Sequence, residues 1–120
     1  MKSLFFIALF CSITIVNAQS NKGKSGVNIV SVKTQSVFGV NIGYYVEFIN
    51  KSSKDVDGLK WKATFTDNFG KKIGEREGSW QSGNFISVIK PGAKTKDLEN
   101  NYIEGATKVF ITITSVHFVE

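Results

Sequence analysis

The segment from Leu59 to Thr66 alternates apolar and polar residues without a break, and this alternation constrains the fold more than any other feature of the chain. Its apolar members are Leu59, Trp61, Ala63 and Phe65. Successive side chains of a β-strand point to opposite faces of a sheet, whereas a helix would scatter these residues around its circumference. The segment therefore predicts a strand with one buried face and one solvated face, which is typical of an antiparallel sheet.

A turn follows this strand at Asp67-Asn68-Phe69-Gly70. Asp and Asn side chains can bond their own backbone, and Gly accepts a positive φ, so the chain is expected to reverse here. We expect the return strand of the hairpin over residues 71–80, with Ile73 as its main apolar contact. Gly74 and Gly78 weaken this strand or mark bulges in it.

Further segments have the composition of strands. Residues 27–33 are rich in β-branched side chains, and residues 44–49 place Tyr44, Val46 and Phe48 on one face before a polar turn at 50–54. Residues 85–89 form a short expected strand that ends at Lys90-Pro91-Gly92, a turn signal. Residues 95–104 fit either an edge strand or a short helix, and the flanking turns favour the strand.

The last expected strand covers residues 108–119, but its apolar residues change parity. Val109, Ile111 and Ile113 share one face, while Val116 and Phe118 fall on the other. A bulge near Ser115 would return the last two to the core and point His117 outward. The alternative is a terminal strand that is covered on both faces. Together these segments predict an all-β chain of about seven short strands with no helix, arranged as a single antiparallel β-sandwich.

The first 18 residues, MKSLFFIALFCSITIVNA, are typical of a signal peptide. Lys2 supplies the positive start, an apolar run follows, and Val16-Asn17-Ala18 forms a small-residue cleavage site. We expect residues 1–18 to be removed, residues 19–26 to form a flexible leader, and residues 27–120 to form the domain. The protein would then be exported, either periplasmic or secreted, with no stable membrane span after cleavage. An uncleaved anchor is an alternative, and so is lipidation at Cys11, although Phe10 is bulky for a lipobox.

The composition excludes several classes of function. The formal net charge is +5, but acids interrupt the lysines throughout, which argues against nucleic-acid binding. His117 is the single histidine and Cys11 the single cysteine, a poor inventory for zinc or for a catalytic triad. The Asp-rich turns lack the spacing of an EF-hand loop, and Glu75 and Glu77 fit a solvated strand face. We therefore predict no catalytic residue, no cofactor and no metal site.

Three stretches together match a known pattern: YVEFINKSSKDVDGLKWKATFTDNFGKKIG from Tyr45, IKPGAKT from Ile89 and KVFITITSVHF from Lys108. The chain resembles the FxLYD-like group of bacterial exported β-sandwiches. The chain has no clear match to the FxLYD signature of that group, because Phe65-Thr66-Asp67 keeps only the Phe and the Asp. The resemblance implies an immunoglobulin-like sandwich acting as an interaction or accessory module, and it implies no catalytic residue.

Aromatic residues are more numerous than a small core requires. We expect Trp61, Phe48, Phe65 and Phe110 in the core. If a contact surface exists, Trp80, Tyr45 and Phe69 are its predicted residues, because each lies in or beside a turn or on an outward strand position.

Two functions follow from these expectations. The leading hypothesis is a non-enzymatic binding or accessory module that contacts a protein or an envelope component through a sheet face or a loop end. The alternative is a small carbohydrate-binding module in which exposed aromatic side chains stack on a glycan. Pairing of an edge strand with a partner's sheet is a further possibility.

Overall fold

The computed structural model describes residues 20–120, so the predicted signal peptide at residues 1–18 lies outside the described part. The described chain is all-β and consists of β1 (Val27–Val37), β2 (Val40–Asn50), β3 (Val56–Thr66), β4 (Lys72–Gln81), β5 (Lys94–Glu99) and β6 (Lys108–Phe118). Within residues 20–120 the structure contains no helix of the length and apolarity that a membrane crossing requires.

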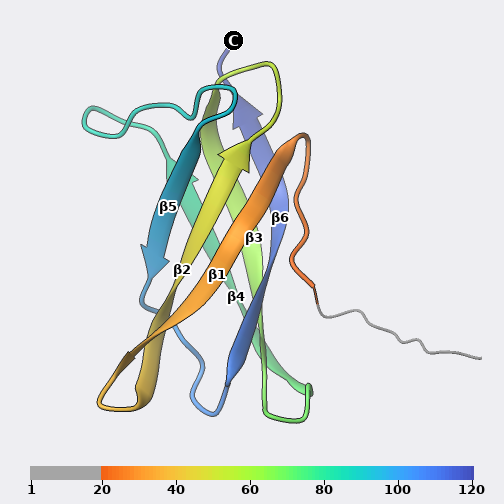
Figure 1. Cartoon of the computed structure of the whole chain (residues 1–120), viewed down its shortest axis with the longest axis vertical. Helices are drawn as coiled ribbons and strands as arrows, with labels where there is room; N and C mark the ends of the chain where they lie inside the picture. The colour runs from red at the N-terminus through yellow and green to blue at the C-terminus, as the bar shows by residue number, and fades with distance from the viewer. Residues whose placement is uncertain (1–19) are drawn as a thin grey trace, which may run out of the picture.

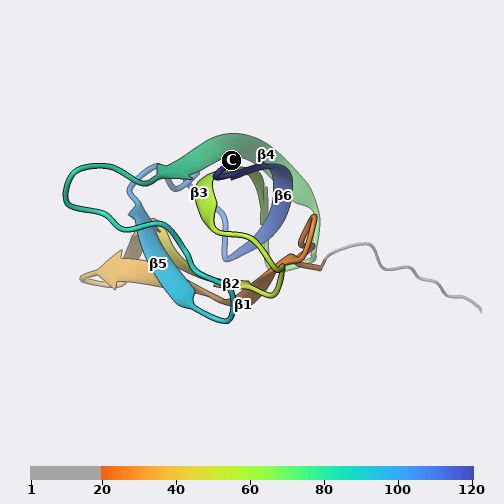
Figure 2. The ribbon, with the colours of Figure 1, turned by 90° about the horizontal axis from the view of Figure 1, so that it is seen from above.

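The six strands form two antiparallel sheets that pack face to face (Figures 1 and 2). One sheet has the order β1-β2-β5 and the other the order β4-β3-β6. Each sheet has one face against the other sheet and one against solvent, as the alternation in β3 predicted. The predicted β-sandwich with a single core is therefore confirmed, with six strands in place of about seven.

The core lies between the two sheets. The faces predicted from alternation are buried as expected: Tyr44, Val46 and Phe48 of β2; Leu59, Trp61, Ala63 and Phe65 of β3; and Val109, Ile111 and Ile113 of β6. Aromatic rings join the sheets at its centre, where the ring centroids of Phe48 and Trp61 are 5.1 Å apart. The indole Nε1 of Trp61 donates a hydrogen bond of 2.9 Å to the Tyr44 hydroxyl. This bond satisfies the two largest buried polar side chains of the core.

The expected strand at residues 85–89 is wrong. Only Ile89 pairs, through an isolated bridge to Val56, while Phe85 and Ile86 are exposed. A local turn in which the Gly83 amide donates to the Ile86 carbonyl closes the segment before it meets a partner strand. The local turn outweighs the β-rich composition of this segment.

The stretch at residues 95–104 is a strand only in its first half. Residues 94–99 form β5 beside β2, which confirms the strand over the helix, and the chain then crosses to the other sheet as a loop. Two predicted core contacts differ. Phe110 is only half-buried because it pairs with Thr64 on the outer face, and Ile73 is 38% exposed because a bulge turns it away from the core.

The bulge predicted in the last strand is confirmed. Ile113 pairs with Trp61 and Ser115 with Lys60, which leaves Thr114 as the extra residue. Val116 and Phe118 consequently pack against the core, and the His117 side chain is 70% exposed. The sheet also shows why Gly78 belongs in β4. A Cβ at Gly78 would lie 2.3 Å from the Trp61 Nε1 atom, so the Trp61 indole needs the space that glycine leaves.

Within the segment expected to be a flexible leader, Asn21 and Lys22 dock on the edge of β6. The Lys22 amide donates to the Ile111 carbonyl at 2.8 Å, and the Ile113 amide donates to the Lys22 carbonyl at 2.9 Å. The side-chain oxygen of Asn21 accepts from the Ile111 amide at 2.7 Å. Composition gave no sign of this docking because it depends on backbone groups, which an open strand edge offers to any extended segment.

Candidate functional site

The β1–β2 hairpin ends in an exposed aromatic residue. Phe38 and Gly39 are the two central residues of its turn, with φ of 51° and 80°. Positive φ at both central positions matches the twist of a two-residue hairpin, but Asn or Asp usually stands where this chain has Phe. The Phe38 side chain is fully exposed, and Val40 beside it is 62% exposed. The hairpin thus presents an apolar tip to solvent.

A second aromatic residue stands at the turn between β3 and β4. The Asp67 side-chain oxygen Oδ1 accepts hydrogen bonds of 2.9 Å from the amides of Phe69 and Lys71. Gly70 completes the turn with a φ of 81°. These contacts fix the backbone while the Phe69 side chain remains 95% exposed. Both turns lie at the lower end of the molecule in Figure 1, and we call this region, defined by Phe38 and Phe69, the hairpin-tip end.

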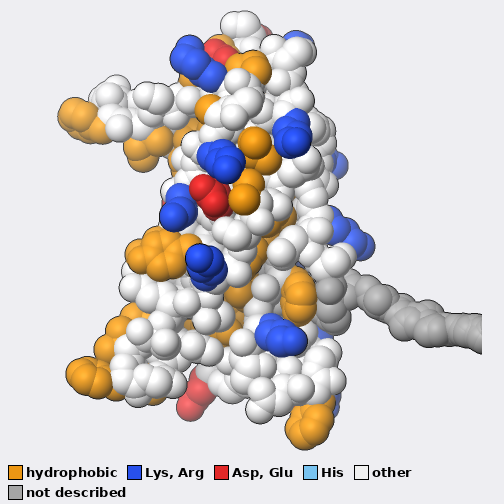
Figure 3. Space-filling view, in the orientation of Figure 1, with side chains coloured by type: hydrophobic (Ala, Val, Ile, Leu, Met, Phe, Trp, Pro, Cys, Tyr) orange, Lys and Arg blue, Asp and Glu red, His pale blue; other side chains and the backbone are white. Residues whose placement is uncertain are grey.

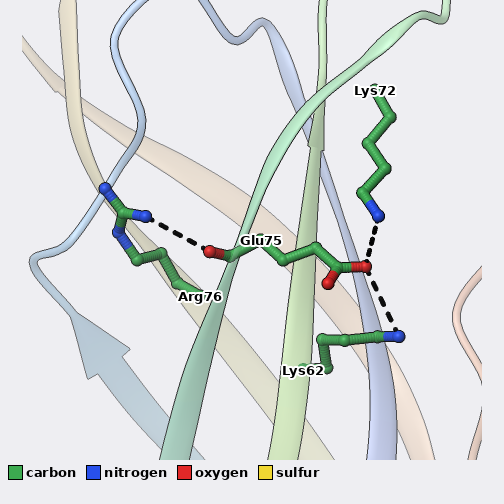
Figure 4. Close-up of polar contacts among 4 residues, drawn as sticks. All are labelled: Lys62, Lys72, Glu75 and Arg76. Carbon is green, nitrogen blue, oxygen red and sulfur yellow. Dashed lines mark hydrogen bonds and ion pairs between the residues drawn. The ribbon is translucent and has the colours of Figure 1, made fainter.

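An ion-pair cluster holds the base of the second hairpin (Figure 4). The Glu75 carboxylate lies 2.7 Å from the Lys72 ammonium and 3.4 Å from that of Lys62. The hydrogen bond from Lys72 and the nearby charge of Lys62 hold the pKa of Glu75 below its usual range. Because the cluster joins β3 to β4 on the solvent face, we assign it to holding the strand pair, in agreement with the predicted solvated face at Glu75 and Glu77.

A groove of about 520 Å³ runs beside the first hairpin tip. Val40 and Asn41 form one wall, and Tyr102, Ile103 and Ala106 of the loop before β6 form the other. The Tyr102 ring packs edge-on against Phe65, with centroids 4.9 Å apart, and burial raises the pKa of the Tyr102 hydroxyl. The hairpin-tip end therefore combines two protruding rings with a neighbouring hollow that is partly apolar.

The three predicted contact residues lie in three different parts of the molecule. Phe69 is at the hairpin-tip end. Tyr45 is 36% exposed on the outer face of the β1-β2-β5 sheet, beside a hollow of about 260 Å³. Trp80 is 6% exposed and belongs to the core. The prediction for Trp80 is therefore corrected: it shares the inward parity of Gly78 in β4 and packs between the sheets.

Sequence reasoning missed Phe38. The only available signal was the pair Phe38-Gly39 between two β-rich runs, and Phe-Gly is not one of the pairs by which two-residue hairpins are recognised. Once the hairpin is known, the apolar exposure of its tip follows, because a turn residue cannot reach the core.

Two inward positions of β5 carry carboxyl groups, Asp97 and Glu99. Burial and the adjacent Asp97 raise the pKa of Glu99 to about 7. Across the interior, burial raises the pKa of the Tyr44 hydroxyl to about 12. Residues 20–120 contain no group of three or more His, Cys, Asp or Glu side chains arranged to hold a metal ion.

No family model matches the chain, and no curated protein matches it. A solved structure that resembles it is the crystal structure of a DUF1425 family member from Shewanella sp. pv-4. The resemblance covers 84% of this chain and 94% of that one, with 20% sequence identity and a TM-score of 0.48. No functional conclusion for this chain follows from a similarity at that level.

Proposed function

We propose that this chain is an exported, non-enzymatic β-sandwich that binds a protein or another envelope component through its hairpin-tip end. The observation that carries the proposal is the exposure of Phe38 and Phe69, at 101% and 95%, on two turns at the same end of the sandwich. The space-filling view shows hydrophobic side chains protruding at both lower corners of the molecule, where these turns lie (Figure 3).

The energetics favour a contact role for both rings. Burying one phenylalanine side chain stabilises a complex by about 1.5–3 kcal/mol, so two rings supply a useful share of a binding free energy. Left-handed backbone at a residue such as Phe38 costs the fold roughly 1–2 kcal/mol. Within the folded domain no core contact repays this cost, because the Phe38 side chain is fully exposed. Rigid turns also limit the entropy that each ring loses on binding.

Two features of the sequence support the export and accessory parts of the proposal. The segment at residues 1–18 has the three parts of a signal peptide. The turn and core residues resemble those of FxLYD-like modules, which implies an accessory role and no catalysis.

Site-specific photo-crosslinking tests the proposal. A photoreactive phenylalanine analogue is placed at position 38 or 69, and Phe85 provides the matched control because it is equally exposed in a loop at the other end. We expect positions 38 and 69 to give the same discrete adduct in cells and position 85 to give none. An adduct at position 85 alone, or none at either hairpin tip, would contradict the proposed surface.

The carbohydrate-binding alternative loses Trp80, and of its two exposed aromatic residues Tyr45 is the one that lies beside a hollow. Its ring lines the hollow of about 260 Å³ together with Ser31, Lys33, Glu47 and Lys96, so polar groups surround an aromatic face. Such a ring is the arrangement on which a sugar could stack. Binding of the domain to a panel of soluble glycans, lost in Tyr45→Ala and kept in Phe69→Ser, would favour this alternative. The hairpin-tip proposal predicts no glycan binding that depends on Tyr45.

A further inference from the structure

A further hollow, of about 510 Å³, lies on the outer face of the β4-β3-β6 sheet, at the end opposite the hairpin tips. Strand register arranges its lining in two rows. Lys60 of β3 lies between Ser79 of β4 and Ser115 of β6. One pair further along, Gly58 of β3 lies between Gln81 and His117.

Gly58 creates the depth of this hollow. Its backbone lies outside the positive-φ region, so no turn or strain requires glycine there. A Cβ at this position would lie 3.4 Å from the Cβ of His117, which is ordinary van der Waals contact. Glycine inside a strand lowers stability by roughly 0.5–1 kcal/mol relative to a residue with a side chain. Gly78 serves the packing of Trp61, whereas Gly58 serves no packing contact and leaves an open floor.

The groups around this floor are mainly hydrogen-bond donors. His117 is held through its Nδ1, which lies 2.5 Å from the Asp57 carboxylate, so its Nε2 stays available. The same contact raises the pKa of His117 and favours its charged form. Lys60 makes no ion pair with any residue of the described chain, and Gln81 adds an amide. Asp57 is the only acid in the lining, and the imidazolium of His117 compensates its charge.

We propose that this hollow binds an oxyanion group, a phosphate or a carboxylate carried by a polar ligand. The Lys60 ammonium supplies the charge, and Gln81, His117 and the two serine hydroxyls supply hydrogen bonds to the oxygens. Because Gly58 has no side chain, the oxyanion group has room to lie between Gln81 and His117. The proposal is independent of the hairpin-tip surface, since the two regions lie at opposite ends of the sandwich.

A nuclear magnetic resonance titration of residues 19–120 tests the site, with sodium phosphate, sodium acetate and sodium chloride as separate probes. We expect saturable shifts of the backbone amides of Gly58, Lys60 and Gln81 with phosphate or acetate, and no saturable shift with chloride. Tighter binding of phosphate assigns a phosphoryl ligand, and tighter binding of acetate assigns a carboxylate ligand. Unsaturated shifts with both probes, or equal shifts with chloride, would overturn the proposal.

Two variants separate a site from general surface charge. Lys60→Gln is expected to weaken binding at least tenfold, while Lys96→Gln, the same charge change on the other sheet, leaves it unchanged. Gly58→Val adds a side chain to the floor at a position where a Cβ meets only ordinary contacts, so it is expected to abolish binding, and circular dichroism checks that the variant keeps its fold. Equal effects of Lys60→Gln and Lys96→Gln, or normal binding in Gly58→Val, would reject the site.

The pH dependence provides a further readout. The charged groups around His117 are Asp57 and Lys60 on β3 and Glu120 after β6. When His117 loses its proton, the charge of Asp57 is no longer compensated and repels the anion. Binding is therefore expected to weaken as the pH rises through the His117 titration, and affinity that is constant from pH 6 to pH 9 would count against the arrangement.

Discussion

Phe38 has a backbone conformation that other residues hold with less strain. Its φ of 51° lies in the left-handed region, which asparagine and glycine accept more readily than phenylalanine. Its side chain gains nothing from the fold, since it is fully exposed. A residue that costs stability and contributes no internal contact is best explained by a contact outside the molecule.

Phe38→Asn is accordingly expected to stabilise the domain by about 1 kcal/mol, because Asn-Gly is a preferred pair for this turn. Urea unfolding followed by tryptophan fluorescence measures the change. Phe69→Asn serves as the comparison, since Phe69 does not have a positive φ and its replacement should change stability little. A destabilised Phe38→Asn variant would show that the ring supports the fold itself.

Glu99 makes stability depend on pH. Its pKa rises from 4.5 to about 7 in the folded state, so the folded protein holds this proton more tightly than the unfolded chain. The stability that this protonated carboxyl contributes is complete below pH 4.5 and is lost as the pH rises through about 7. Glu99→Gln is therefore expected to raise the melting temperature at pH 8 more than at pH 4.5. Equal shifts at both values would contradict the raised pKa of Glu99.

Among the strands, β4 contains a glycine, Gly78, whose missing side chain is needed for core packing. Gly78→Ala would place a Cβ 2.3 Å from the Trp61 indole, and the indole is fixed by its bond to Tyr44. We expect a loss of about 2–3 kcal/mol in the free energy of unfolding, as overpacked cores show. Gly83→Ala is the matched control, because nothing lies within 4 Å of its Cβ position. Equal unfolding free energies for the two variants would contradict the packing described for β4.

Asn21 and Lys22 cover the edge of β6 through a single bridge. A protein that begins at Gly23 loses two backbone hydrogen bonds to β6 and the bond from Ile111 to Asn21. With each bond contributing about 0.5–1.5 kcal/mol, we expect a loss of roughly 2–3 kcal/mol and self-association through the exposed edge. Chemical unfolding and sedimentation velocity measure both effects. A shortened protein that is equally stable and monomeric would show that the docking is not needed.

The elements differ in how far the sequence predicts them. The alternation of apolar and polar residues was sufficient to predict β2, β3 and β6, because one face of each strand is buried and the other is solvated. It failed at residues 85–89, where composition favoured a strand but only Ile89 forms a bridge. It also failed for Trp80, because the position of a turn-proximal aromatic depends on strand register, and register follows from long-range pairing. The docked leader depends on backbone groups and one bond to the Asn21 side chain, and these contacts produce no periodic pattern in the sequence.

At the scale of the whole molecule, the features that the described residues 20–120 present to solvent are turns and sheet faces. Its two sheets close over a core of aromatic and aliphatic side chains, and the groups that remain accessible lie on turns and on outer strand faces. Of the candidate surface residues, Phe69 was recognised from its turn motif, whereas Phe38 and the hollow at Gly58 depend on hairpin geometry and cross-strand register. The two ends of the sandwich thus carry different chemistry, apolar at the hairpin tips and donor-rich around Lys60.

The most direct test of the hairpin-tip surface is the affinity of labelled residues 19–120 for isolated cell envelopes of the source organism. Phe38→Ser with Phe69→Ser is expected to weaken saturable binding at least about tenfold without lowering the melting temperature, since both rings are exposed. Phe85→Ser, the same change in the loop at the other end, is expected to bind as the unchanged protein does. Full binding by the double variant, or an equal loss in Phe85→Ser, would contradict the proposed function.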